Sequence, residues 1–145
     1  MELVHCIYCS VSTSGDIDAG QLAQLLEKCR SNNATCDVTG MLLYQNGSFF
    51  QVLEGNRGTV ERLFDKIAID PRHKRVTKVI LEPIAERAFG DWTMGYPQIT
   101  SKELAEIPGL NDFFRQASSY LELGEGRAKT LLAAFKEGKW RARLS

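Results

Sequence analysis

Two stretches of the chain repeat hydrophobic residues at the i, i+3, i+4, i+7 spacing of an amphipathic helix, with short apolar runs around them. The first helix is predicted from Leu22, Leu25, Leu26 and Cys29, and the second from Val60, Leu63, Phe64 and Ile67. The apolar runs predict strands at residues 3–10, 38–44, 48–54 and 76–83, and a fifth strand starting near residues 92–94.

Local signals set the ends of these elements. Asp16 or Asp18 can cap the first helix, which is expected to end near residues 32–33. Asn46-Gly47 is a strong hairpin signal between the second and third strands. Pro71 stops the second helix, because the residue before a proline is pushed out of the helical region.

The resulting order is strand, helix, strand, strand, helix, strand, strand, as in a split βαβ arrangement. It predicts an α+β fold of the ferredoxin-like kind, a mixed sheet with two helices on one face. We assign residues 1–97 to this domain and residues 98–145 to a helical C-terminal extension.

The extension repeats the helical spacing at Ala128, Leu131, Leu132 and Phe135. It is too small to fold alone, so it must pack on the domain or on another subunit. Its apolar face, with Trp140 beyond it, would be exposed in a monomer, and we therefore expect a homo-oligomer.

Composition describes an ordinary soluble domain: 145 residues, 43% of them hydrophobic and 25% charged. No apolar run approaches the length of a membrane span, and the first residues lack a signal peptide's basic start, so a cytoplasmic protein without membrane contact is expected. Formal charge is zero. Residues 126–145 nevertheless carry six basic side chains and one acidic one. With no nucleic-acid motif present, this basic end favours protein contact or solvation, and a nucleic-acid partner is not expected.

The four cysteines are Cys6, Cys9, Cys29 and Cys36. Cys6 and Cys9 have the spacing of zinc or redox sites, but on a strand they point to opposite faces. No second such pair and no paired histidines complete a zinc site. All four are expected to be reduced packing residues, and no metal is expected.

Gln51 stands where an apolar residue would be expected. Its strand alternates faces, so Gln51 shares one face with Phe49 and Leu53. An unpartnered buried amide costs roughly 1–3 kcal/mol, so Gln51 needs a polar partner in the protein or in a ligand.

Further polar and aromatic residues are expected on the same side of the sheet. Tyr8 lies near the end of the first strand, and Asn32 and Asn33 lie at the end of the first helix. Trp92 and Met94 are two residues apart on the fifth predicted strand and so share a face. Each has an ordinary structural explanation when taken alone.

Together these segments resemble the BLUF family of flavin-holding blue-light receptors. The resemblance spans residues 3 to about 97 and rests on five motifs: Cys6-Ile7-Tyr8-Cys9-Ser10, residues 32–40, residues 41–55, Asp70-Pro71-Arg72-His73 and Phe89-Gly90-Asp91-Trp92-Thr93-Met94. The extension looks like that of short, stand-alone members, which leaves no room for a fused cyclase or phosphodiesterase.

The resemblance implies a flavin between the two helices, usually FAD in this family, with FMN or riboflavin as possibilities. The residues that it implies for binding are Tyr8, Leu25, Lys28, Asn32, Asn33, Gln51, Ile67, Arg72 and His73. Leu25 and Ile67 would flank the ring, and Asn33 would bond its carbonyl edge with Asn32 nearby. Arg72 and His73, with Lys28 or Arg30, would lie towards the phosphates.

The resemblance also implies a photoactive switch made of Tyr8, Gln51, Trp92 and Met94. Tyr8 can give an electron and then a proton to an excited flavin. Gln51 offers both a donor and an acceptor, so its rotation or tautomerisation changes what it presents to the flavin. Trp92 or Met94 would pass the change to a surface and so to a separate effector or response-regulator-like protein.

Two other classes of function remain open at this stage. A flavin-dependent redox enzyme is weakened because no nicotinamide-binding or glycine-rich loop accompanies the site, and we expect that the chain is not an enzyme. A light-independent interaction module would need Tyr8 and Gln51 only to bond each other.

Overall fold

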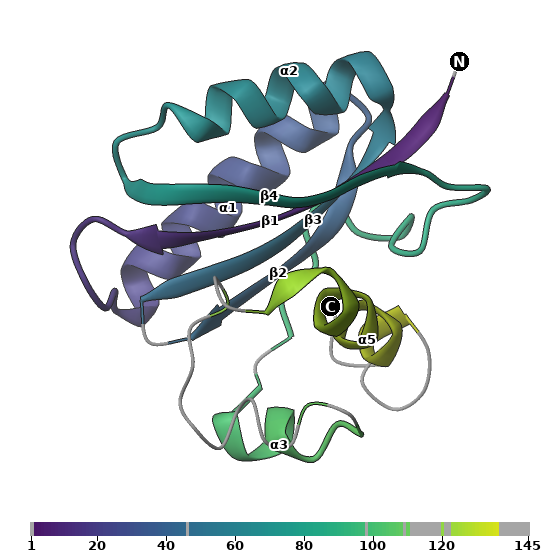
Figure 1. Ribbon diagram of the computed structural model, residues 1–145. Coiled ribbons are helices and arrows are strands. Elements are labelled where there is room, and N and C mark those ends of the chain that lie inside the picture. Colours follow the sequence, from purple (N-terminus) through teal and green to yellow (C-terminus); the bar gives the residue numbers. More distant parts are fainter. Residues whose placement is uncertain are drawn as a thin grey trace.

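The computed structural model describes residues 2–45, 47–97, 99–108, 110, 120 and 123–136. Its elements, shown in Figure 1, are β1 (Leu3–Ser12), α1 (Ala19–Thr35), β2 (Thr39–Gln45), β3 (Ser48–Asn56), α2 (Arg57–Ala68), β4 (His73–Pro83), α3 (Ser101–Ala105) and α5 (Gly124–Lys136). Every helix and strand expected up to residue 83 is present, with ends that differ from the prediction by a few residues.

The four strands form one sheet in the order β2-β3-β1-β4. All three neighbouring pairs are antiparallel. This order and the two helices on one face confirm the ferredoxin-like α+β fold. The parallel part of the expected mixed sheet is reduced to a single bridge between Met41 and Gly95.

Among the described residues, the fifth strand predicted to start near residues 92–94 is present only as an isolated bridge between Gly95 and Met41. Trp92 N donates to Phe89 O at 3.0 Å, so the chain turns there instead of extending. Backbone pairing with the edge strand β2 begins at Trp92 itself: Gly40 N donates to Trp92 O at 3.1 Å, and Gly95 exchanges hydrogen bonds with Gly40 and Leu42. Residues 92–94 therefore do not alternate between two faces as a strand would.

Side chains define where both long helices begin. Asp18 caps α1 in a capping box with Gln21, as one of the two aspartates was expected to do. Asn56, the last residue of β3, caps α2 by accepting from Gly58 N at 3.0 Å. The α1 helix continues to Thr35, beyond the end predicted at residues 32–33.

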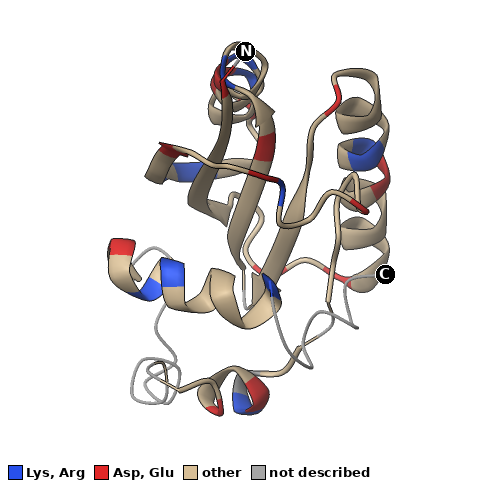
Figure 2. Cartoon of the chain, turned by 90° about the vertical axis from the view of Figure 1, so that its right-hand side faces the viewer, with Lys and Arg blue, Asp and Glu red and all other residues tan. Residues whose placement is uncertain are grey.

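Each face of the sheet has its own hydrophobic cluster. Tyr8, Phe49, Leu53 and Phe64 belong to the cluster beneath α1 and α2. The opposite cluster includes Phe50, and α5 packs on that side (Figures 1 and 2). Cys6 lies in the first cluster and Cys9 in the second, and all four cysteines are free, as expected.

The C-terminal extension packs on the domain of its own chain. Ala128, Leu131, Leu132 and Phe135 of α5 are buried in the cluster on this side of the sheet, so the described part of the apolar face is covered within the chain, and the homo-oligomer stays a prediction. Trp140 lies outside the described residues. The boundary at residue 97 stays a prediction, although the extension and the sheet share one hydrophobic cluster.

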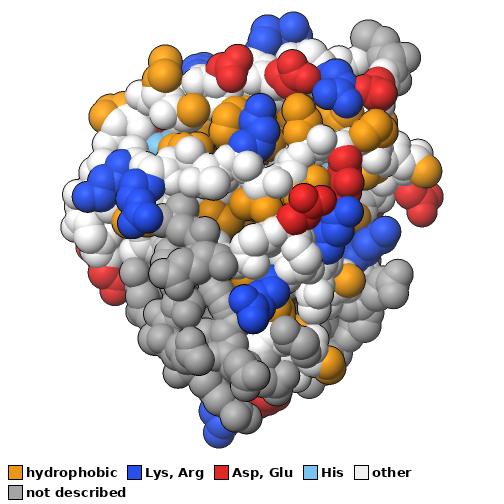
Figure 3. All heavy atoms as spheres, in the orientation of Figure 1, with side chains coloured by type: hydrophobic (Ala, Val, Ile, Leu, Met, Phe, Trp, Pro, Cys, Tyr) orange, Lys and Arg blue, Asp and Glu red, His pale blue; other side chains and the backbone are white. Residues whose placement is uncertain are grey.

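The visible surface offers no large apolar area. Figure 3 shows hydrophobic side chains in small areas divided by charged and polar ones. Ile69, with 82% of its surface accessible, is the one large hydrophobic residue that is exposed among those described. Within the same residues, no helix combines the length and the apolar character needed to cross a membrane.

Candidate functional site: a cleft between two helices

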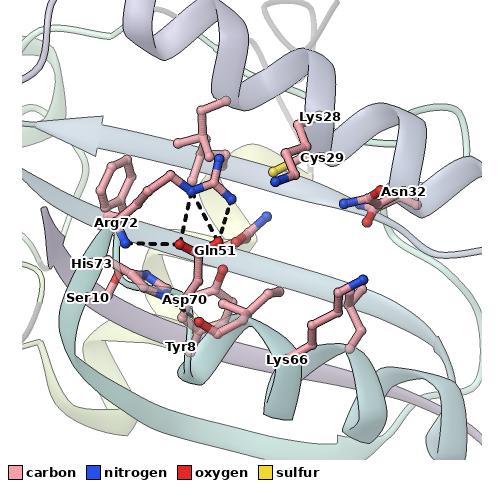
Figure 4. Close-up of a pocket in the computed structure, with 16 residues that line it drawn as sticks. Tyr8, Ser10, Lys28, Cys29, Asn32, Gln51, Lys66, Asp70, Arg72 and His73 are labelled. Atoms are coloured by element: carbon pink, nitrogen blue, oxygen red, sulfur yellow. Dashed lines mark hydrogen bonds and ion pairs between the residues drawn. The ribbon is translucent and has the colours of Figure 1, made fainter.

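A cleft lies between α1 and α2 above strands β1 and β3 (Figure 4). It holds about 850 Å³ of space, a volume that includes its open mouth. All nine side chains implied for cofactor binding line it: Tyr8, Leu25, Lys28, Asn32, Asn33, Gln51, Ile67, Arg72 and His73. The fold therefore brings together residues that are up to 65 positions apart in the sequence.

Tyr8 and Gln51 form the floor of the cleft. They are register partners on the adjacent strands β1 and β3, and they are only 3% and 4% exposed. The ring of Tyr8 meets Phe64 edge to face at a centroid distance of 5.5 Å. Burial raises the pKa of the Tyr8 hydroxyl well above its ordinary value, so the phenol keeps its proton at neutral pH.

Met94 is the residue of the predicted switch that reaches Gln51. Gln51 Nε2 donates to Met94 Sδ at 3.4 Å, and Met94 is 1% exposed. From α1, Asn33 Nδ2 donates to Thr93 O at 2.7 Å and Arg30 Nε donates to Met94 O at 3.0 Å. The segment at residues 93–94 is thus held jointly by α1 and by the glutamine of the cleft.

Trp92 does not share a face with Met94, and the prediction that it would is wrong. It packs against the hydrophobic cluster on the far side of the sheet, whereas Met94 lies in the cluster beneath the helices. The cause is the turn that places Trp92 N on Phe89 O. Arg30 is not among the cleft-lining residues either, because its guanidinium is used at Met94 O.

Arg72 and His73 line the cleft but are committed to protein partners. Arg72 forms a two-pronged ion pair with Asp70, with Nε 3.0 Å from Oδ1. The His73 ring lies between Ser10 Oγ, 2.9 Å from Nδ1, and the carbonyl of Ile67 next to Nε2. Both residues therefore hold the loop after α2 in place.

Seven of the cleft-lining residues lie outside the set that sequence reasoning implied for binding: Ser10, Cys29, Leu42, Phe49, Leu63, Lys66 and Asp70. Lys66 and Asp70 line the cleft without belonging to the predicted set. Each is adjacent or nearly so to a predicted residue, which is a signal that could have found them. Cys29 also lines it; burial raises the pKa of its thiol, and the charge of Arg72 and a hydrogen bond from Gln51 oppose that rise.

Glu54 was also missed, although it lies three residues from Gln51 on β3. It is the only Asp, Glu, Lys or Arg on β1, β2 and β3, which are fully described, and it is 0% exposed. Its Oε1 accepts from Thr39 Oγ1 at 3.0 Å and from Phe89 N at 2.9 Å, and its Oε2 accepts from Ala88 N at 2.6 Å. Glu54 thereby anchors the chain that leads to Met94.

Comparison with known proteins identifies this arrangement. Residues 3–95 match the family model described as sensors of blue-light using FAD. The chain belongs to the BLUF family. BLUF proteins are flavin-binding sensors of blue light, so the resemblance stated from the motifs is confirmed.

Relatives of this BLUF chain include much larger proteins. It is 39% identical over 104 residues to the photoactivated adenylate cyclase subunit beta of Euglena longa, covering 70% of this chain and 12% of that protein. The alpha subunit of Euglena gracilis is also 39% identical, over 103 residues that make up 10% of it. The chain thus spans about a tenth of the length of these relatives.

Solved structures give the same family. BlsA in its ground state has a TM-score of 0.77 and 28% identity, covering 94% of this chain and 89% of that one. The dark state of BlrB, a BLUF protein, has a TM-score of 0.70 and 32% identity, covering 92% of this chain and 97% of that one. The likeness therefore reaches beyond residues 3–95 into the C-terminal extension.

The side chains of the BLUF cleft suit a flavin. Aliphatic Leu25 and Ile67 come from the two facing helices, and the buried amides of Gln51 and Asn33 lie below them. Gln51 Nε2 donates to a thioether sulfur, which is a weak hydrogen-bond acceptor. A carbonyl oxygen or a ring nitrogen of a flavin would accept a stronger hydrogen bond from it. A flat apolar ring with polar edges matches such a set.

The loop after α2 is expected to give the BLUF domain an acid-sensitive element. Hydrogen bonds from Arg72 lower the pKa of the Asp70 carboxyl in this loop, and on β4, outside the loop, a hydrogen bond from His5 lowers the pKa of Glu82. The pKa values of Asp70 and Glu82 are lower in the folded state than in the unfolded state. The two carboxylates therefore contribute fully to stability above the unfolded pKa of about 4, and this contribution is lost as pH falls below it. Denaturant titrations of the wild type and Asp70→Asn should differ most above pH 5, and the difference should shrink progressively as pH falls from about 4 towards the lowered pKa of Asp70. A constant difference down to pH 3 would contradict this.

Proposed function

We propose that this BLUF protein uses FAD as its chromophore and reports blue light to a separate effector protein through Tyr8, Gln51 and Met94. The contact between the Gln51 amide and the Met94 sulfur carries the proposal, because it joins the cleft to a segment whose residues Trp92 and Thr93 are partly exposed. Leu25, Asn32, Asn33 and Ile67 would hold the ring.

The flavin would supply the visible absorption and, when excited, an oxidant for a neighbouring phenol. Tyr8 suits the role of donor since it is buried in the cleft and keeps its proton at neutral pH, so it can give up an electron and that proton together. The side chain next to it in register is Gln51, which can respond to the change.

Gln51 can reorient at small cost. A hydrogen bond to a thioether is weak, so turning the amide away from Met94 Sδ loses little. The backbone at residues 93–94 stays tied to α1 by Asn33 and Arg30. Loss of the Gln51 contact would therefore change the position of the Met94 side chain, and with it that of Arg30, which bonds Met94 O and is exposed on α1. The segment at residues 93–94 would then have two states, and the cleft would decide between them.

The test of the proposed function is a visible spectrum of the purified protein before and after blue light. A flavin spectrum that moves to the red under illumination and returns in darkness is expected. A colourless protein that also refuses added riboflavin, FMN and FAD would end the proposal.

Replacing Tyr8 with phenylalanine tests the switch itself. We expect Tyr8→Phe to keep its flavin and to lose the light-induced red shift, because the hydroxyl proton is gone while the ring still packs on Phe64. Tyr44→Phe is the matched control: Tyr44 bonds the backbone at Ile17 and Gly47 and is not among the cleft-lining residues. An equal shift in Tyr8→Phe and the wild type would contradict the role of Tyr8.

A further inference from the structure

Lys78 lies next to Tyr8 in a row of residues that crosses the sheet. Gln51 of β3 is the register partner of Tyr8 on β1, and Tyr8 is in turn the partner of Lys78 on β4. Strand β1 lies between the other two (Figure 1). Gln51 and Tyr8 line the cleft, whereas Lys78 does not. Tyr8 therefore has the glutamine of the cleft on one side and a lysine on the other.

An irregularity in β4 turns Lys78 towards α2. Ile7 pairs with Ile80, and the next residue of β1, Tyr8, pairs with Lys78, so this register skips Val79. Val79 and Ile80 are adjacent, yet both pack in the cluster on the α5 side of the sheet. The extra residue reverses the alternation of the strand, as a β-bulge does, and places Lys78 on the face that carries Tyr8.

The ammonium of Lys78 lies over an aromatic ring that meets Tyr8. Lys78 Nζ is 4.7 Å from the centroid of the Phe64 ring, and the centroids of the Phe64 and Tyr8 rings are 5.5 Å apart. Only one ring thus lies between the positive charge and the phenol. Lys78 is exposed, and it forms no ion pair with any residue in the described part of the chain. No carboxylate of these residues therefore neutralises its charge at short range.

We propose that the ammonium of Lys78 opposes the loss of an electron from Tyr8 and so slows the light reaction. The inference rests on the proposed function, in which the excited flavin takes one electron and the hydroxyl proton from Tyr8 and later returns both. Removing the electron leaves positive charge on the phenol until the proton follows, and a nearby cation raises the energy of that charge. Lys78 thereby resists loss of the electron ahead of the proton and favours loss of both together.

The fluorescence lifetime of the bound flavin measures this rate, because electron transfer from Tyr8 quenches the excited state. Lys78→Met keeps an unbranched side chain over Phe64 but removes the charge. In the full chain loaded with FAD, its lifetime should be about threefold shorter than that of the wild type, the order expected for one partly screened charge. Lys78→Arg keeps the charge and should keep the wild-type lifetime. The lifetime of bound flavin does not depend on how much of each variant folds.

A Tyr8→Phe background separates the effect of charge from a change in the shape of the cleft. Tyr8→Phe and Tyr8→Phe/Lys78→Met should have equal lifetimes, since both lack the electron donor. A merely structural role of Lys78 would change the lifetime in both backgrounds. Lys102→Met removes the same charge from an exposed lysine on α3 and should match the wild type. The difference between Lys78→Met and the wild type should shrink at high salt, because exposed charges are screened.

A wild-type lifetime in Lys78→Met would overturn this role of Lys78. An equal shortening in Lys78→Arg, or a shortening that persists without Tyr8, would also overturn it. In each case a reversible red shift that is lost in Tyr8→Phe would still support the proposed function. An unaltered chain without a red shift, or a Tyr8→Phe chain with a normal one, would instead overturn the role of Tyr8, and the role of Lys78 with it.

Discussion

Gln51→Leu is expected to retain its flavin and to show no light-induced red shift at all. Leucine has nearly the volume of glutamine and suits the cluster that contains Phe49 and Leu53, so the cleft should keep its shape. What disappears is the amide, with the donor that reaches Met94 Sδ and the acceptor that a reoriented carboxamide would present. The measurement is a light-minus-dark difference spectrum of the purified variant.

A matched glutamine on the surface controls for the substitution. Gln24 is exposed on α1, and Gln24→Leu should shift like the wild type. The thermal stability of Gln51→Leu should stay close to that of the wild type, because the lost bond to sulfur is weak. A red shift of normal size in Gln51→Leu would refute the assignment of Gln51 as the switching side chain.

Glu54→Ala should show the largest loss of stability of any substitution considered. It removes the acceptor of two backbone N–H groups, at Ala88 and Phe89, and of the Thr39 hydroxyl, all next to a carboxyl group that is 0% exposed. Each buried donor left without a partner costs roughly 1–3 kcal/mol, so we expect the free energy of unfolding to fall by about 4 kcal/mol. Urea denaturation monitored by circular dichroism measures this.

Glu86→Ala is the control, because Glu86 is exposed in the same connection between β4 and residue 88. Its effect should be within about 0.5 kcal/mol, as for most surface substitutions. The loss of stability in Glu54→Gln should lie between those of Glu54→Ala and Glu86→Ala. The glutamine amide keeps one acceptor oxygen but turns an NH₂ group towards a donor. A Glu54→Ala protein as stable as Glu86→Ala would contradict the anchoring role.

The elements that sequence predicts well are those with strong local signals. The helix spacing of Val60, Phe64 and Ile67, the cap at Asp18 and the strand that carries Gln51 all appear in the structure where expected. These features depend on residues within one or two turns of each other. Periodicity and capping act over that range, so the sequence contains them directly.

The candidate residues of the cleft were also within reach of the sequence, through the motifs of the family rather than through spacing. Tyr8, Gln51 and Asn33 each have an ordinary explanation alone, and their meaning came from occurring together. Lys66 and Asp70 escaped because a charge at a helix end is usually only solvated, and nothing local shows that the two helices face each other across a cleft.

The sequence itself determined three things: the succession of strands and helices along the chain, the packing face of each helix, and the polar residue on an apolar strand. Each follows from short-range periodicity. The tertiary structure alone decided which of Trp92 and Met94 meets Gln51, since a turn at Phe89 breaks the alternation. It also decided that α5 covers its own sheet and that Asp70 occupies Arg72. Such contacts join segments far apart in the chain or compete for one charged group, and no local pattern records them.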